Sequence, residues 1–303
     1  MKPKFELDLS NSVKDNILRI LHEQYTNIIE YCKNQEKDPD KAVHEIRKSF
    51  KRIRASLRLI RDEIGYSTYY RENAFCRDEA KLISDLRDLK VFHEDLGYLA
   101  KAHNDSADLK LIELLQEEIL NRKDQRFSKV YSEQVFQTII QDVKAAMDRI
   151  KLLHFKHDNF QVIVGGLYRI YKQGQKELEL VKKEPTTENY HDLRKRVKYL
   201  MYFAQILKPV YPQYFKGMDK MLDKASDQLG IDHNYAELIR FVEGLKKRGV
   251  TQKRKADFIS WLQALRSQLQ DPALESIQMV YVETPEDFIN RVKKYFEITY
   301  SVN

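Results

Sequence analysis

Apolar residues recur in this chain at the spacing of an α-helix, and residues 41–63 and their neighbours show the pattern most clearly. The apolar positions there follow one another at intervals of three or four: Ile46, Phe50, Ile53, Leu57, Ile60 and Ile64. This spacing keeps all of them on one face of a helix with about 3.6 residues per turn. A chain that repeats the pattern over most of its length builds its core by packing helices against helices. The sequence therefore predicts an all-α protein.

Turn-forming residues support the same prediction. Only 9 glycines and 7 prolines occur among the 303 residues, so few tight turns of the kind that sheet proteins need are available. The periodicity predicts helices over 10–33, 41–63, 70–102, 108–123, 129–151, 160–183, 188–207, 212–230, 233–248, 253–270 and 285–300. One stretch, 276–282, has strand character, and we expect a loop or an isolated strand there. We expect the last helix to dock on its own domain.

A motif of eight residues occurs twice, 147 positions apart. Residues 44–51 and 191–198 both have the order His, acid, aliphatic, Arg, Lys, any residue, apolar, Lys, and a loop with a proline precedes each copy. The simplest origin is a duplication. We therefore expect two helical halves, 1–150 and 151–303, which together form one domain, and each half would contribute one motif helix to a shared site.

The first motif copy begins a long stripe of positive charge. Basic residues follow at intervals of three or four positions, with Lys48 and Arg52 beside them: His44, Arg47, Lys51, Arg54, Arg58 and Arg61. Between His44 and Arg61 the only acid is Glu45. Like charges one turn apart repel each other, and an ordinary solvated helix intersperses acids that neutralise them. The stripe thus needs a compensating anion, which either the protein or a ligand would supply.

The second copy has a shorter stripe. Its basic positions are His191, Arg194, Lys195 and Lys198. The stripe then reaches Met201 and Gln205, where the first copy continues with Arg54 and Arg58, so we expect the second half to bind an anion more weakly. The segment before it adds three basic residues on one helix face: Arg169, Lys172 and Lys176.

These motifs resemble the CHAD family, the conserved histidine α-helical domain. The similarity rests on the two motif copies, on Tyr202 after the second, and on 86–88 and 229–234, and it spans about residues 15–245. The resemblance implies two four-helix bundles related by pseudo-twofold symmetry around a basic central cavity. It also implies non-catalytic binding of inorganic polyphosphate in that cavity. Met201 and Ser84 depart from the family pattern, which usually has Arg and Gly there.

The stripes and the resemblance together assign the polyphosphate contacts to basic side chains from three expected helices: His44, Arg47, Lys48, Lys51, Arg54, Arg58, Arg169, Lys172, Lys176, His191, Arg194, Lys195 and Lys198. Sulfate or phosphate would serve as surrogate ligands. We expect no cofactor, no metal and no catalytic residue.

Other functions fit parts of the sequence. A net charge of +7 fits nonspecific nucleic-acid binding, but base stacking needs aromatic residues among the basic ones, and the stripe from His44 to Arg61 carries none. The dipeptide His191-Asp192 fits a helical metal-dependent phosphohydrolase of the HD type. Its further ligands would come from His154, His157, Asp223, Asp227 and Asp232. A scaffold on polyphosphate granules is a third function, compatible with the first.

Location follows from what the sequence lacks. Two cysteines, Cys32 and Cys76, are too few for a disulfide framework or a cysteine-rich zinc module. No run of about 18 apolar residues suggests a membrane span, and residues 1–9 have no apolar signal region. We expect a cytoplasmic protein that can associate with polyphosphate granules.

Overall fold

The computed structural model describes residues 4–102, 106–245 and 251–302, and helices dominate all three ranges. In chain order they are α1 (Val13–Lys33), the 3-10 helix η1 (Gln35–Lys37), α2 (Pro39–Leu59), α3 (Arg61–Ile64), α4 (Tyr66–Lys81), α5 (Ser84–Ala102), α6 (Ser106–Ser132), α7 (Val135–Lys151), α8 (Gln161–Lys183), α9 (Thr187–Leu207), α10 (Pro212–Glu243), α11 (Gln252–Val280) and α12 (Pro285–Val302). The predicted all-α class is confirmed, since these ranges contain no strand. A search of the same residues finds no helix with an apolar stretch that could span a lipid bilayer.

Local capping signals start the two motif helices. The Asp38 carboxylate accepts a hydrogen bond from the Lys41 backbone N–H at 3.0 Å, and Pro39 takes the first position of α2. A proline at this position costs no helical hydrogen bond, because the first N–H groups of a helix have no partner within the helix. At α9 the Thr186 hydroxyl accepts from the Asn189 N–H at 3.2 Å. Both copies of the motif therefore lie in helices that begin where the proline-containing loops end.

Several helix boundaries differ from the prediction. The segment 70–102 is divided into α4 and α5, and 41–63 into α2 and α3, whereas 212–230 continues into the next helix as α10. The end predicted at Arg248 lies outside the described residues.

The prediction of a loop or strand over 276–282 was wrong, because α11 continues to Val280. Ala273 and Ile277 are fully buried on that extension, and Tyr281 just beyond it packs edge-on against Tyr171 of α8. Burial of this face outweighs the local preference for extended backbone.

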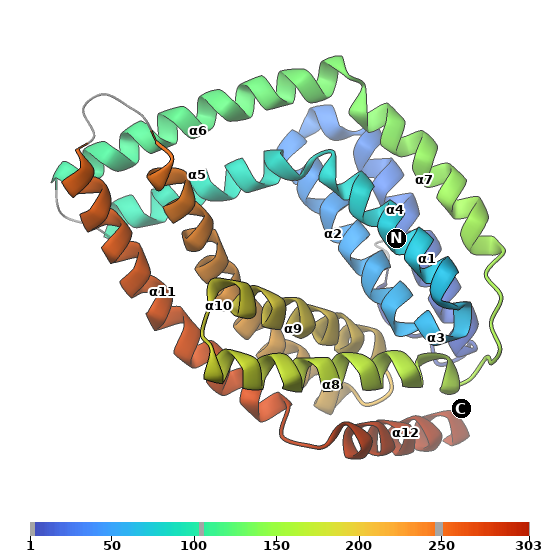
Figure 1. Cartoon of the computed structure of the whole chain (residues 1–303). Coiled ribbons are helices and arrows are strands. Elements are labelled where there is room, and N and C mark those ends of the chain that lie inside the picture. Colours follow the sequence, from blue (N-terminus) through green and yellow to red (C-terminus); the bar gives the residue numbers. More distant parts are fainter. Residues whose placement is uncertain (1–3, 103–105, 246–250, 303) are drawn as a thin grey trace.

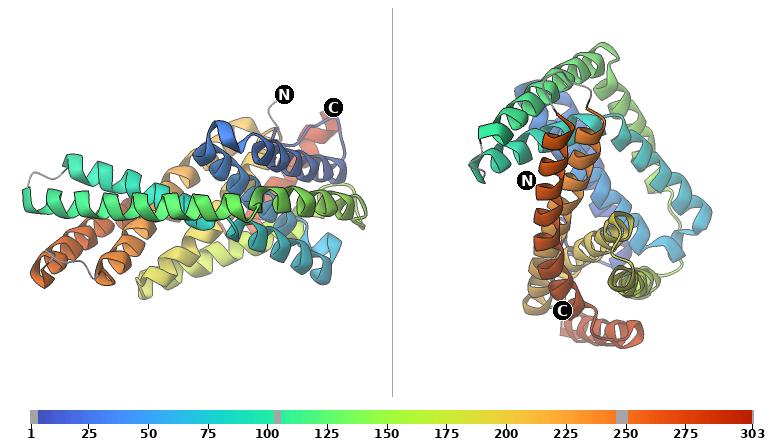
Figure 2. Two further views of the ribbon diagram at one scale, coloured as in Figure 1. Left: turned by 90° about the horizontal axis from the view of Figure 1, so that it is seen from above. Right: turned by 60° about the vertical axis from the view of Figure 1, so that its left-hand side comes forward.

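The helices pack in two groups, which touch where α2 contacts α8 and α9, where α3 contacts α8, and where α5 contacts α10 (Figure 1). In one group α1 packs against α2 and α7, and α2 against α4; in the other α8 packs against α9, α9 against α10, and α10 against α11. The motif helices α2 and α9 contact each other, and α2 also contacts α8. Seen from above in Figure 2, the α5–α6 pair and the α10–α11 pair extend together to one end of the molecule. Helix α12 packs on α8, as expected for the last helix.

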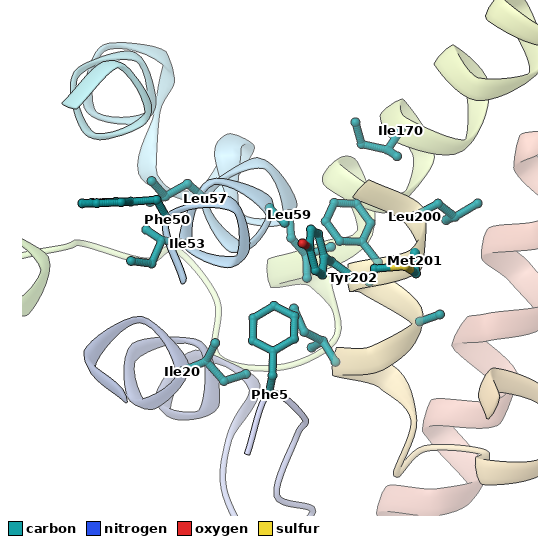
Figure 3. Packing of buried hydrophobic residues seen from close by; sticks show 14 of the residues in the cluster. Phe5, Ile20, Phe50, Ile53, Leu57, Leu59, Ile170, Leu200, Met201 and Tyr202 are labelled. Atoms are coloured by element: carbon teal, nitrogen blue, oxygen red, sulfur yellow. The ribbon is translucent and has the colours of Figure 1, made fainter. Parts of the chain in front are cut away.

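One apolar core runs through both halves of the chain. The N-terminal segment illustrates this, because Phe5 lies edge-on to Tyr202 of α9 with ring centroids 5.8 Å apart (Figure 3). The Leu7 N–H donates to the Ile206 carbonyl oxygen at 2.9 Å. A second apolar cluster joins α5 and α6 to α10 and α11. The boundary at residue 150, the duplication and the pseudo-twofold symmetry stay predictions.

Helix α8 crosses the end of α2 at Gly166. A Cβ at this position would overlap the backbone carbonyl of Leu59, so any larger residue would push the two helices apart. This contact fixes how the second half sits against the first motif helix.

Candidate functional site

Helix α2 separates its apolar and basic residues onto different faces, as the spacing predicts. Ile46, Phe50 and Ile53 are fully buried in the core. Burying this face turns the basic positions toward α4, α5 and α9. Arg47 shows the result: its guanidinium lies 3.5 Å from the Ala80 carbonyl oxygen at the end of α4 and 3.6 Å from a carboxylate oxygen of Asp88 in α5.

An open pocket of about 220 Å³ lies beside this basic face. Its lining combines α2 with the end of α4 and the start of α5: Arg47, Phe50, Lys51, Arg54, Arg77, Ala80, Lys81 and Ser84. Five of these eight residues are basic. The Nε of Arg47, one of the lining residues, is buried and has no hydrogen-bond partner among the described residues. The basic lining of the pocket suits a small multivalent anion.

Helix α9 presents Arg194 and Lys198. The Arg194 Nε donates to the Ser226 carbonyl oxygen of α10 at 3.3 Å, and its guanidinium passes over Gly230, where an added Cβ would come within 3.0 Å of it. The Lys198 ammonium lies 3.7 Å from a carboxylate oxygen of Asp223. Burial is the main cause that lowers the pKa of both basic groups.

The two motif helices meet electrostatically at Lys51. Lys51 is exposed as a residue, but protein atoms crowd its side chain, and the resulting loss of hydration is the largest cause that lowers its pKa. Arg47, Arg194 and Lys198 add repulsion, Asp88 partly offsets it, and together these effects bring the pKa to about 7. Basic groups of α9 therefore repel the Lys51 ammonium of α2, and Asp88 offsets this repulsion only in part.

Burial lowers the pKa of both motif histidines and so favours their uncharged form. The ring of His191 packs against that of His233 in α10, with centroids 4.4 Å apart. Burial, followed by the repulsion of nearby charges, lowers the pKa of both imidazoles to about 4. Burial and then the charge of Arg87 also lower the pKa of His44. Neutral imidazoles can donate or accept hydrogen bonds at the site without adding charge.

Arg54 and Arg58 contact residues of other helices that the sequence pattern did not predict as their partners. The side-chain oxygen of Asn73 in α4 accepts from Arg54 Nε at 3.1 Å and from Arg58 Nη1 at 2.9 Å. The Arg58 guanidinium also lies 4.1 Å from the ring centroid of Tyr199 in α9. Arg58 therefore joins α2, α4 and α9 in addition to any contact with an anion.

Two predicted contacts, Lys48 and Lys195, occupy equivalent places in the motifs and have similar partners. Lys48 lies 3.5 Å from Glu45, and Lys195 lies 2.7 Å from Asp192, one turn earlier on the same helix in each case. These accessible pairs at the surface contribute little stability and can exchange with a bound anion.

The predicted residues of α8 form a separate group. Arg169 is bound by both carboxylate oxygens of Asp62 in α3. Lys172 lies 3.4 Å from the Tyr168 hydroxyl, and Lys176 is exposed further along the helix. These contacts do not bring α8 into the charge cluster around Lys51.

Sequence reasoning missed Arg77 and Lys81 of α4, Arg87 near His44, and His233 beside His191. Arg77 and Lys81 are four positions apart and share a helix face, which is a signal that could have drawn attention to them. Their approach to α2 depends on the packing of α4, which the spacing does not reveal.

The described ranges contain no cluster of side chains suited to bind a metal ion. No group of three or more His, Cys, Asp or Glu residues there could hold a metal ion. Two carboxylates of the HD-type alternative are already paired, Asp192 with Lys195 at 2.7 Å and Asp232 with Arg266 at 2.8 Å.

The fold and the paired basic helices define a class, the all-helical domains with a repeated histidine-containing motif. The family model of the CHAD domain matches residues 19–243, and the chain belongs to this family. Among solved structures it is similar to PptA from Streptomyces chartreusis, with a TM-score of 0.61, 12% identity, and coverage of 90% of this chain and 100% of that one. It is also similar to the CHAD domain from the plant Ricinus communis, with a TM-score of 0.60, 14% identity, and coverage of 92% and 95%. These likenesses concern the fold, and no curated protein sequence matches the chain.

Proposed function

We propose that this chain binds inorganic polyphosphate without catalysis, through the basic surface that α2 and α9 share. Membership of the CHAD family, which is linked to polyphosphate binding, supports the ligand class. The observation that carries the proposal is the contact between α2 and α9, which brings Arg194 and Lys198 near enough to Lys51 for their charges to lower its pKa. Arg47 and Arg54 extend this surface into the pocket beside α4. The expected setting is the cytoplasm, at polyphosphate granules.

The chemistry of polyphosphate suits such a surface. The ligand is a flexible chain of phosphates without bases, so charge, hydrogen-bond acceptors and shape are all that a protein can recognise. An arginine fork binds two phosphate oxygens, and a lysine adds a mobile point charge. Basic residues one turn apart along α2 lie about 5.4 Å from each other along the axis, which lets successive phosphates meet successive side chains.

Salt dependence tests the electrostatic part of this proposal. If about four phosphates are contacted, raising the salt from 50 to 200 mM should weaken binding by about 50-fold, because condensed counterions are released on binding. The measurement is a fluorescence titration with long-chain polyphosphate at several salt concentrations. Absence of binding at low salt would overturn the proposal.

The comparison with nucleic acid tests ligand choice. Polyphosphate should bind at least about tenfold more tightly than single- or double-stranded DNA at equal phosphate and salt concentrations, because its phosphates are closer together and more flexible. Equal affinities would instead support nonspecific nucleic-acid binding.

The pKa of Lys51 predicts a pH dependence of binding. Below pH 7 its ammonium is charged, whereas above pH 7 the free protein loses this charge and a polyanion must restore it by proton uptake. Affinity for polyphosphate should therefore fall by about tenfold between pH 7 and pH 9 at constant ionic strength. Lys51→Arg stays charged over this range and should lose no more than about twofold. If the affinity of the wild type fell with pH no more steeply than that of Lys51→Arg, Lys51 would not be the group that causes the pH dependence.

A further inference from the structure

Two exposed tyrosines gather at the end of the α2 stripe. Tyr66 and Tyr70, one turn apart at the start of α4, are 63% and 57% exposed. Their rings are stacked, with centroids 6.1 Å apart and an interplanar angle of 29°. We call them the tyrosine pair. Solvent reaches more than half of each residue, so a planar ligand can reach the ring faces that the two tyrosines do not turn toward each other.

The tyrosine pair is continuous with the basic stripe. The Arg61 guanidinium, last in the stripe, lies 5.0 Å from the ring centroid of Tyr66 and 5.3 Å from that of Tyr69. The next basic residue, Arg58, lies 6.0 Å from the same Tyr69 ring. The stripe itself carries no aromatic residue, and the fold supplies these from α4. Base stacking needs aromatic residues among phosphate-binding side chains, and the tyrosines of α4 meet this requirement although the stripe itself has none.

Nearby charges leave the arginines available to a phosphate. Asp62, the acid that follows Arg61, is engaged by Arg169 of α8 and so does little to neutralise Arg61. Arg54 and Arg58 have the neutral Asn73 amide as their shared hydrogen-bond partner. An inorganic polyphosphate would use these arginines but would gain nothing from the tyrosines, since it has no aromatic group.

We propose that the tyrosine pair stacks the base of a nucleoside triphosphate whose phosphates lie along Arg61, Arg58 and Arg54. Base stacking on tyrosine is tolerant of base identity, because every base has an aromatic face. The arginines would supply forked donors to the phosphates, and Arg61 would contact both parts of the ligand. This inference rests on the proposed function, since the same stripe holds the phosphates in both cases.

The test compares ATP with inorganic tripolyphosphate, which has the same number of phosphates and no base. Both are titrated in magnesium-free buffer against the wild type, Tyr66→Leu/Tyr70→Leu and the control Tyr98→Leu. Tyr98 is 70% exposed on α5 and reports any general effect of losing a surface tyrosine. Leucine keeps a strong helix former at each exposed position, and far-UV circular dichroism verifies folding.

The wild type and Tyr98→Leu should bind ATP about tenfold more tightly than tripolyphosphate, the effect of one stacked base. In Tyr66→Leu/Tyr70→Leu this preference should disappear while tripolyphosphate affinity stays unchanged. Saturation transfer from protein to the adenine protons should vanish in the same variant.

Equal binding of ATP and tripolyphosphate by the wild type would overturn the inference and leave the proposed function intact. An ATP preference that survives in the tyrosine variant would also overturn it. Failure of tripolyphosphate, long-chain polyphosphate and ATP all to bind would overturn both proposals.

Discussion

Replacing Lys51 and Lys198 together by glutamate should weaken the binding of long-chain polyphosphate by at least about 100-fold. One residue comes from each motif helix, and the charge of Lys198 lowers the pKa of Lys51. A charge-assisted hydrogen bond contributes about 1.5–3 kcal/mol, so two lost contacts correspond to about 3–6 kcal/mol. Each 1.4 kcal/mol is about tenfold in affinity, and the new carboxylates add repulsion.

The control for this experiment changes net charge equally at a distance. Lys144 of α7 and Lys294 of α12 are exposed, and Lys144→Glu/Lys294→Glu should lose no more than about fivefold, because exposed charges more than about 10 Å away are screened by salt. Equal losses in both double variants would show that overall charge, rather than the shared surface, drives binding. The single variants Lys51→Glu and Lys198→Glu complete a double-mutant cycle, in which non-additive losses are expected if both side chains contact one bound chain.

Replacing Arg149 by methionine should lower the free energy of unfolding by about 3 kcal/mol, the lower end of the range for breaking a buried ion pair. Glu72 of α4 is fully buried, and Arg149 of α7 donates to its two carboxylate oxygens at 3.0 Å each. Without Arg149, the one ion-pair partner of Glu72 left among the described residues would be Arg71, at 2.7 Å and mostly exposed. We choose the lower end because Arg149 is itself one-third exposed, which weakens the pair through solvent screening.

Urea unfolding of three variants checks this prediction. Glu72→Gln/Arg149→Met should recover about half of the loss, because the double variant leaves no buried charge behind. Asp148→Asn removes only an exposed pair with Lys151 and should change the free energy of unfolding by no more than about 0.5 kcal/mol. A loss as small in Arg149→Met as in Asp148→Asn would show that this ion pair does not hold α4 against α7.

The faces and the start of helix α2 could be predicted from the sequence alone. Its apolar stripe is buried and its basic stripe lies on a separate face, as the spacing predicts, and its start at Asp38 and Pro39 follows from capping. These features depend on residues within one or two turns of each other, so a single sequence contains all the information that they need. For the same reason the all-α class was predictable.

The partners of the predicted site residues were not predictable in this way. Arg169 is a predicted contact whose charge is bound by Asp62, 107 positions earlier in the chain, whereas Arg77 was overlooked and lines the pocket. Arg58 stacks on Tyr199, which belongs to the other half. Each of these interactions joins different helices, and the periodicity within one helix carries no information about which neighbour it meets. The strand prediction for 276–282 failed for a related reason, since burial of Ile277 decided the backbone there.

By itself the sequence determined the helical class, the two motif helices, their basic faces and the CHAD family, because spacing, caps and motifs are local properties of the chain. Only the tertiary structure decided that α2 contacts α9, so that Arg194 and Lys198 act on the charge of Lys51, and that tyrosines from α4 lie beside Arg61. Those meetings follow from how the helices cross, as at Gly166, where a missing side chain lets α8 approach α2. Electrostatic and stacking energies depend on distances in space, and the crossing of helices sets those distances.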